Sequence, residues 1–215
     1  MTHHEASQKG SSTQWSWKMT ARRIRVPLGF ATAALYLFEV IRHPAHPVAI
    51  AWSLALVVPG LALRAAASGT VRKNRELAVT GPYAYTRNPL YLGSILIAAG
   101  FAVALLSWLL ALVLAAGFAL IYIPVIASEE QFLRATFPGF DDYCRSVPRL
   151  IPRLIPHRGP ATRDAAATSG KAEGGFSFTL YLKHREYNAA LGAALLYLSL
   201  LLLRPALELL LHLPR

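Results

Sequence analysis

The sequence predicts an all-α, polytopic integral membrane protein with about five transmembrane helices. Of its 215 residues, 54% are hydrophobic and only 15% are charged, whereas soluble domains usually carry about 25% charged residues. Long runs without charge alternate with short basic segments. A spanning helix needs roughly 20 mostly apolar residues, and residues 90–127 contain no charged residue at all.

Two apolar runs, 27–41 and 48–67, predict the first pair of spans. The turn between them contains Pro44 and Pro47, which break a helix because proline lacks the backbone donor. Basic residues flank the outer ends of this pair. The positive-inside rule therefore places the N-terminus and the loop 68–88 in the cytoplasm.

The uncharged run 90–127 predicts two further spans. As one helix, these roughly 38 residues would extend about 57 Å at 1.5 Å per residue, nearly twice the thickness of the hydrocarbon core. We therefore expect two spans with a tight reversal near 105–108. Two crossings return the chain to its starting side, so the segments before and after the run face the same compartment. A last apolar run, 189–203, ends at Arg204 and Pro205 and predicts the fifth span.

The organisation of the chain follows from these runs. Residues 1–18 are polar, fit no cleavable signal peptide and predict a disordered tail. Residues 19–158 would hold four spans with their cytoplasmic segments. Residues 159–175 are rich in Ala, Gly and Thr and predict a flexible linker. Residues 176–215 would begin with an interfacial helix over 176–187 and end with the last span.

The net charge of +11 does not predict a nucleic-acid partner. The basic residues lie at the ends of apolar runs, as the topology rule requires, and no zinc-finger, homeodomain or RNA-binding motif accompanies them. The single cysteine, Cys144, allows no intrachain disulfide. His43 and His46 lack further ligands nearby in the sequence, so no metal site is expected.

The first segment with candidate chemistry is Gly81-Pro-Tyr-Ala-Tyr-Thr-Arg-Asn-Pro-Leu-Tyr-Leu-Gly93. Asn88 is a favourable N-cap residue, and Pro89 suits the first helical position. The third span would therefore begin here, with its free N–H groups and positive dipole end at the cytoplasmic interface. A carboxylate could bind there, beside Arg87 and three tyrosines.

The second segment begins with Glu129 and Glu130 directly after an uncharged span. Carboxylates in that position are costly unless they are solvated or paired, which makes them functional candidates. One of the two is expected to be simply solvated, because neighbouring helix positions diverge by about 100°. An aromatic and glycine-containing stretch follows, and then Val147-Pro-Arg-Leu-Ile-Pro152.

Together, the two segments resemble the isoprenylcysteine carboxyl methyltransferase and phospholipid methyltransferase superfamily over residues 48–156. The resemblance implies a bacterial-type integral membrane enzyme that binds S-adenosylmethionine between the two segments, at the cytoplasmic face of the inner membrane. Arg87, Asn88 and Glu129 would be its catalytic residues. The implied cofactor-binding residues are Tyr83, Arg87, Asn88, Pro89 and Tyr91 on one wall, and Glu129, Glu130, Tyr143, Arg149 and Leu150 on the other.

The sequence departs from the family at two positions. Many members have histidine where this chain has Asn88, and asparagine cannot titrate near neutral pH. Asn88 therefore fits cofactor positioning better than proton transfer. Phe140 stands where a tyrosine is frequent, and it lacks the hydroxyl. For single residues, the simpler interpretations are an aromatic belt for the tyrosines and topology alone for Arg87.

The methyl acceptor is expected to be lipophilic and to enter from the bilayer. A carboxylate acceptor, such as that of an isoprenylated cysteine, would need no base, and the nearest histidines in the sequence, His157 and His184, are expected to be surface residues. Arg185, Glu186 and Asn188 would orient its polar end, although a helix start also favours such residues. Two alternatives stay open. One is an NADPH-dependent membrane reductase of the sterol-reductase type, and the other is a non-catalytic lipid-binding membrane protein.

Overall fold

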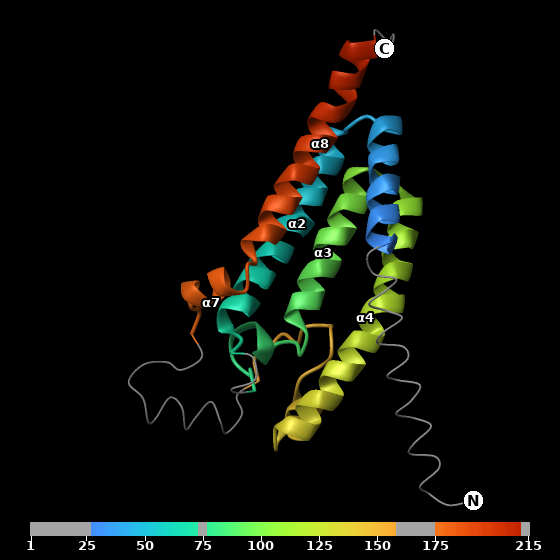
Figure 1. Cartoon of the computed structure of the whole chain (residues 1–215). Coiled ribbons are helices and arrows are strands. Elements are labelled where there is room, and N and C mark those ends of the chain that lie inside the picture. Colours follow the sequence, from blue (N-terminus) through green and yellow to red (C-terminus); the bar gives the residue numbers. More distant parts are fainter. Residues whose placement is uncertain (1–26, 73–76, 158–174, 212–215) are drawn as a thin grey trace, which may run out of the picture.

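The computed structural model describes residues 27–72, 77–157 and 175–211, and all regular structure within these ranges is helical (Figure 1). The predicted all-α class is therefore confirmed. The predicted tail, 1–18, lies outside the described residues. The predicted linker, 159–175, also lies outside them, except for residue 175. After a helix over 27–42, the elements are α2 (Pro47–Thr70), η1 (Gly81–Ala84), α3 (Pro89–Ala104), α4 (Trp108–Thr136), α5 (Phe140–Ser146), α7 (Phe178–Lys183) and α8 (Tyr187–Leu211).

Three of the described helices, α2, α4 and α8, are long and apolar enough to cross a membrane. This agrees with a polytopic membrane protein. Helix α3 is apolar but only 16 residues long, and the described part of the first helix covers only residues 27–42. For these two helices, full crossing stays a prediction. Figure 1 shows the long helices side by side, with the loops of both sequence motifs gathered at one end.

The predicted reversal within the uncharged run is confirmed. Helix α3 ends at Ala104, and α4 begins at Trp108. Leu106 adopts a left-handed φ of 49° between them. Ser107 then caps α4, because its side chain accepts a hydrogen bond from the Leu110 amide at 3.1 Å. This cap satisfies one of the free donors that every helix start exposes.

Helices α2 and α3 pack closely through small residues. A Cβ at Gly93 would lie 2.7 Å from the Gly60 carbonyl oxygen, and one at Gly100 would lie 2.5 Å from Val57 Cγ2. Small residues allow such close approach between spans. Two hydrogen bonds join α8 to its neighbours: Tyr36 Oη donates to Leu196 O at 2.7 Å, and Ser53 shares one with Tyr197 at 2.5 Å.

The C-terminal part differs from the sequence prediction in two places. The interfacial helix is shorter than 176–187, since α7 spans Phe178–Lys183 and Arg185 adopts a left-handed φ of 54°. The last helix is longer than 189–203, because α8 continues through Pro205 to Leu211. An ion pair between Arg204 and Glu208 at 2.8 Å links successive turns across this proline, which compensates part of the cost of proline within a helix.

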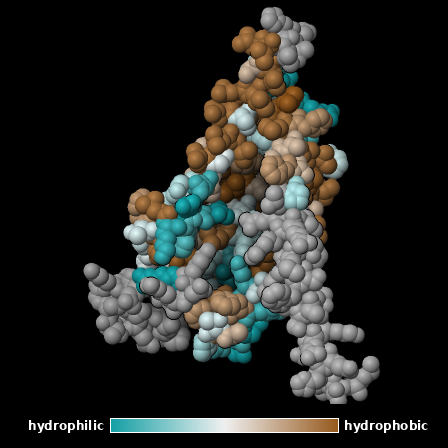
Figure 2. All heavy atoms as spheres, in the orientation of Figure 1, coloured by the Kyte–Doolittle hydropathy of each residue, from teal (hydrophilic) through white to brown (hydrophobic). Residues whose placement is uncertain are grey.

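Hydrophobic side chains cover most of the spanning helices, and hydrophilic ones gather toward the end that carries η1 and α7 (Figure 2). We call this the polar end of the molecule: residues 77–88, α5 and the segment 147–157. A small buried cluster of Phe140, Tyr143 and Val147 packs there against Leu77, Val79 and Leu133. It holds the two motif segments under the lower ends of α3 and α4.

Candidate active site

The two motif segments lie side by side in the structure, as the sequence predicts. The Arg87 amide donates to Pro148 O at 2.9 Å, the Arg153 amide to Tyr85 O at 3.0 Å, and the His157 amide to Ala84 O at 2.9 Å. Between them, the fully buried Thr86 hydroxyl lies 3.1 Å from Arg149 O and 3.2 Å from Leu150 O. The second motif is therefore anchored to the first by backbone groups and one buried hydroxyl.

Glu130 links these segments to α4. Glu130 is buried, with 7% of its surface exposed. Its carboxylate accepts two hydrogen bonds from Arg149, with Nε to Oε1 at 3.1 Å and Nη2 to Oε2 at 2.6 Å. Arg87 Nη1 lies 3.3 Å from the same carboxylate. Such bidentate, charge-assisted pairs are strong and directional, and the hydrogen bond to Glu130 raises the pKa of Arg149. Two arginines thus neutralise Glu130.

Glu129 differs from its neighbour. It is exposed and accepts one hydrogen bond, from Tyr91 Oη at 3.0 Å. The Tyr91 ring meets Tyr122 edge to face, with centroids 5.1 Å apart. The two adjacent carboxylates therefore diverge around the helix, and Glu129 faces the cavity with open coordination while Glu130 faces the arginines.

Asn88 occupies the predicted N-cap position of α3, with Pro89 following it, but its side chain does not cap the helix. Instead, Nδ2 donates to Arg149 O at 3.0 Å. The side-chain role expected from the sequence is thus wrong in detail. The fold brings the Arg149 carbonyl within reach, and the amide satisfies that acceptor rather than the free donors of its own helix.

Tyr143 on α5 binds the first motif, since its hydroxyl donates to Tyr83 O at 2.7 Å. Burial raises the pKa of both phenols, and for Tyr83 the carboxylates of Glu129 and Glu186 add to this effect. Both phenols therefore stay protonated at neutral pH, and the Tyr143 hydroxyl acts as a donor. Phe140, at 1% exposure, is buried beside them, where a ring without a hydroxyl leaves no polar group unpaired.

A cavity of about 580 Å³, which we call the motif cavity, opens between these groups. Its volume is within the usual range of small-molecule sites. Eight of the ten predicted cofactor residues line it: Tyr83, Arg87, Asn88, Pro89, Tyr91, Glu129, Glu130 and Tyr143. Arg149 and Leu150 do not line it. Instead, the Arg149 side chain binds Glu130 and the Leu150 carbonyl oxygen accepts from Thr86, which fixes the segment 147–157 in place. The remaining lining is largely apolar and aromatic, with Phe132, Phe137 and Tyr122 among its members.

One atom in this cavity wall is unsatisfied. Arg87 Nε is buried and has no hydrogen-bond partner, and buried donors normally have one. Arg87 is held in place by the hydrogen bond from its backbone amide to Pro148 O, by the ion pair with Glu130 and by the contact of its guanidinium with Cys144 Sγ. Because Arg87 lines the cavity, a ligand with an acceptor oxygen, such as a carboxylate, would find a charged donor there. The residues present therefore fit S-adenosylmethionine, which carries both a carboxylate for Arg87 and an ammonium group for Glu129.

The side chains of the predicted substrate residues have different surroundings. Glu186 is bound to Arg64 of α2, whose Nε and Nη2 donate to Oε2 at 3.1 and 2.8 Å. Asn188 lines an apolar cavity beside α8. Arg185 is exposed and lines none of the three cavities described here.

Sequence reasoning missed Arg64, although a cation within the apolar run 48–67 is itself a signal of function. Its Nη1 donates to Ser94 Oγ at 2.6 Å. Arg64 and Ser94 line both the motif cavity and an apolar cavity of about 790 Å³ between α8, α3 and the helix over 27–42. The polar site and the membrane-facing cavity thus meet at these two side chains.

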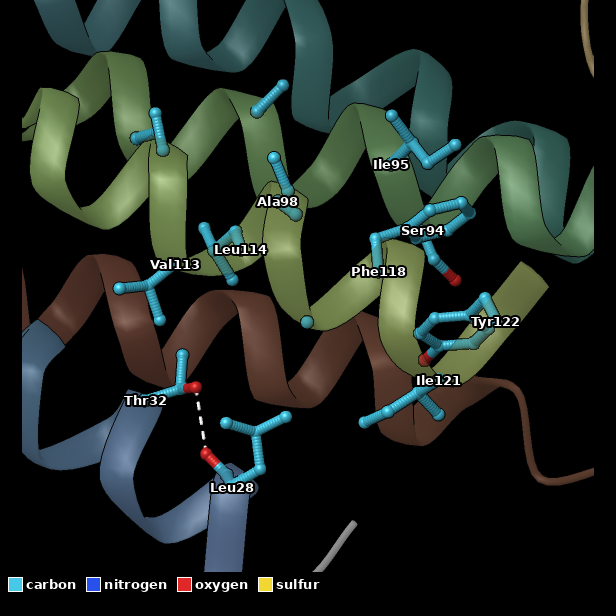
Figure 3. A pocket seen from close by; sticks show the side chains of 16 residues that line it. Leu28, Thr32, Ser94, Ile95, Ala98, Val113, Leu114, Phe118, Ile121 and Tyr122 are labelled. Carbon is cyan, nitrogen blue, oxygen red and sulfur yellow. Dashed lines mark hydrogen bonds between the residues drawn. The ribbon is translucent and has the colours of Figure 1, made fainter. Parts of the chain in front are cut away.

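A second apolar cavity, of about 610 Å³, lies between the helix over 27–42, α3 and α4. Figure 3 shows its apolar wall, with Ile95 and Ala98 facing Leu114 and Phe118, and with Thr32 hydrogen-bonded to Leu28 O at 2.8 Å. Ser94 and Tyr122 belong to this wall and also to the motif cavity. Among the described residues, no group of three or more His, Cys, Asp or Glu side chains is placed to hold a metal ion.

Comparisons with known proteins bear on the same segment. Two curated relatives match 91 residues, 42% of this chain: the nickel-cobalt-cadmium resistance protein NccN of Alcaligenes xylosoxydans xylosoxydans, 41% identical, and the cobalt-zinc-cadmium resistance protein CzcN of Cupriavidus metallidurans, 42% identical. The match spans 43% and 42% of these relatives, so less than half of either is covered. No solved structure gives a significant match. The phospholipid methyltransferase family model matches residues 61–139, and this segment therefore carries a domain of the isoprenylcysteine carboxyl methyltransferase-like superfamily.

Proposed function

We propose that this protein transfers a methyl group from S-adenosylmethionine to a lipophilic acceptor that reaches the site from the membrane. One observation carries the proposal: the motif cavity, with Arg87 and the exposed Glu129 in its wall, meets an apolar cavity at Arg64 and Ser94. The family match over residues 61–139 supports the same reaction class.

In this proposal, two residues bind the cofactor and a third positions the wall of the site. Arg87 donates to its carboxylate, and Glu129 pairs with its ammonium group. Asn88 holds the segment 147–157 against the start of α3 through its bond to Arg149 O. Tyr91, Phe132 and Phe137 offer aromatic surface for the adenine. When bound, the cofactor supplies a methyl group on a cationic sulfonium.

Positioning is the main task of such a site, since methyl transfer is an in-line displacement. Glu130 contributes indirectly, because it fixes Arg87 and Arg149 in one geometry. The cavity walls exclude water on the apolar side, where cation and anion neutralise each other more favourably than in bulk water. Within the described part of the chain, no histidine or lysine lines the motif cavity. This supports an acceptor that is already ionised, such as the carboxylate of an isoprenylated cysteine or of a similar lipid.

The polar acceptor end would arrive past the Arg64–Glu186 pair, and Asn188 lies on the wall of the apolar cavity that leads to it. With the basic flanks of the first two spans on the cytoplasmic side, the site faces the cytoplasm. We place the protein in a bacterial inner membrane.

The test uses the purified full-length protein in nanodiscs. Calorimetric titration with S-adenosylmethionine is expected to show binding to one site, and titration with NADPH to show none. Incubation with methyl-labelled cofactor and a bacterial lipid extract should move label into the lipid fraction. Binding of NADPH alone would identify the reductase alternative, and binding of neither cofactor would favour a non-catalytic lipid-binding protein.

A further inference from the structure

We propose that the segment 147–157 is a lipid-docking lip: Ile151, Leu154 and Ile155 insert into the headgroup boundary of an anionic leaflet beside the active site. The sequence repeats Arg-Leu-Ile-Pro at 149–152 and 153–156, and the methyl-transfer proposal does not use these apolar side chains. The inference concerns a membrane-binding surface and does not depend on that reaction.

Exposure singles out these residues. The exposed fraction is 80% for Ile151, 97% for Leu154 and 72% for Ile155. Isolated exposed apolar residues are ordinary, but a contiguous set on a charged surface marks an interaction site. Here three large aliphatic side chains within five residues are exposed, in the part of the molecule where hydrophilic side chains gather (Figure 2).

The fold imposes this exposure. The backbone of the lip is fixed to the first motif by the bonds from Arg87, Arg153 and His157, and Thr86 anchors its centre. Arg153 Nη1 also donates to Ser146 O. A segment bound in this way cannot turn its apolar side chains inward without breaking several buried hydrogen bonds.

Depth argues for lipid as the occupant. Helix α4 runs nine residues past Ala127, where the uncharged run ends, to Thr136, which carries the chain about 13 Å out of the apolar layer. After α5, the lip returns to the level of residues 84–87, directly before α3 begins at Pro89 (Figure 1). The three aliphatic side chains therefore lie at the level where the apolar helix α3 begins.

Charge argues for the same occupant. Arg145 and Arg149 are exposed and pair with Asp142 and Glu130, whereas Arg153, between Ile151 and Leu154 in the sequence, donates to the Ser146 carbonyl oxygen. Apolar side chains that enter the acyl boundary among basic neighbours are the pattern of interfacial membrane contacts, and the Arg153 guanidinium would add favourable attraction to an anionic surface. A symmetric contact between two copies would instead bring the same arginines together.

The experiment measures depth in nanodiscs. In a Cys144→Ser background, Leu154→Cys and, as a matched control, Asp142→Cys are labelled with an environment-sensitive fluorophore. Asp142 lies on α5 with a 79% exposed side chain. Because the lip would reach about 5–10 Å into the boundary, we expect a blue-shifted emission at position 154 and several times more quenching by shallow doxyl lipids than at position 142. Raising the fraction of phosphatidylglycerol should increase that quenching.

Two results would overturn the proposal. One is a label at position 154 that is as water-exposed and as poorly quenched as the label at position 142. The other is shielding of position 154 in detergent that grows with protein concentration, which would assign the surface to a second copy. Leu150→Cys is the internal check on folding, since that side chain is only partly exposed, and it should be quenched less than position 154.

Discussion

Two neighbouring carboxylates on α4 have different surroundings, and we therefore expect Glu129 to bind the cofactor and Glu130 to stabilise the structure. Glu129 is exposed beside Tyr91, whereas Glu130 is buried between Arg87 and Arg149. A cofactor ammonium group can pair with Glu129 at little cost. Glu130 is already neutralised, and removing its charge would leave two arginines without their partner.

Glu129→Gln is expected to weaken S-adenosylmethionine binding by about tenfold or more, because a charge-assisted bond is lost, while thermal stability without cofactor stays unchanged. Calorimetry and a thermal melt of the same sample measure both quantities. Asp142→Asn, an exposed acid on α5, is the control and should leave affinity unchanged. Unaltered affinity in Glu129→Gln would contradict this role.

Glu130→Gln is expected to show the reverse order of effects. It should lower the free energy of unfolding by about 2 kcal/mol, the cost of an unsatisfied charged partner after allowance for the half-exposed Arg149. The cofactor would still be bound once the protein is folded, although less tightly, since Arg87 loses its support. Unfolding of the variant in detergent, followed by circular dichroism, measures the loss. A variant as stable as the wild type would show that the pair carries no structural role.

The Tyr143 phenol links stability to pH. Burial raises its pKa above the ordinary value of 10.0, so the folded state holds the phenolic proton more tightly than the unfolded chain does. Its contribution is complete below pH 10 and is lost as the pH rises through the folded pKa. Tyr143→Phe should therefore be less stable than the wild type at neutral pH, and the gap should narrow above pH 10. Melting temperatures across this range provide the measurement, and a constant gap would refute the linkage.

At the scale of elements, the α2–α3 contact sets where the site can form. Gly60 and Gly93 allow the two helices to approach, and Arg64, one turn from Gly60, then reaches Ser94 and Leu90 O on α3. Close packing at this point places the start of α3, and with it Arg87 and Asn88, next to the end of α4. Substitutions here should act on the site through packing.

Gly93→Ala is expected to destabilise the protein by about 1–3 kcal/mol, the usual cost of overpacking. Its Cβ would meet Arg64 Cγ at 2.6 Å and the Gly60 carbonyl oxygen at 2.7 Å, and a backbone oxygen cannot move aside cheaply. Gly192→Ala on α8 is the matched control, since nothing lies within 4 Å of its Cβ, and it should be neutral or slightly stabilising. Thermal melts in detergent compare the two, and equal stability would argue against tight α2–α3 packing.

At the scale of the whole molecule, the hairpin of α3 and α4 returns the chain to the same end of the molecule. This geometry allows a pocket to form from segments about 40 residues apart in the sequence. It also predicts the sides on which exposed positions lie. His46, between the first helix and α2, is exposed at the end opposite to Asp142 on α5.

In a Cys144→Ser background, His46→Cys and Asp142→Cys should react from opposite sides of the membrane. A membrane-impermeant maleimide is expected to label His46→Cys in intact spheroplasts and Asp142→Cys only in inverted vesicles. The same side for both positions would contradict the hairpin, and exchanged sides would invert the topology while preserving the pocket.

The sequence alone determined the membrane class, the reversal between α3 and α4, and the meeting of the two motifs. These features depend on the length of apolar runs and on the placement of charge, which are local quantities. The resemblance also predicted ten cofactor-binding residues. Eight of them line the motif cavity, and the other two, Arg149 and Leu150, do not.

Only the tertiary structure decided how those residues share the work. The pairing of Glu130 rather than Glu129, the redirection of Asn88 to the Arg149 carbonyl, and the junction at Arg64 and Ser94 all rest on contacts between distant segments. The sequence does not encode these choices locally, because a side chain's direction around a helix has chemical meaning only when the neighbouring helix and loop are in place. The same holds for Thr86, an ordinary residue in the sequence that becomes the buried link between the two motifs.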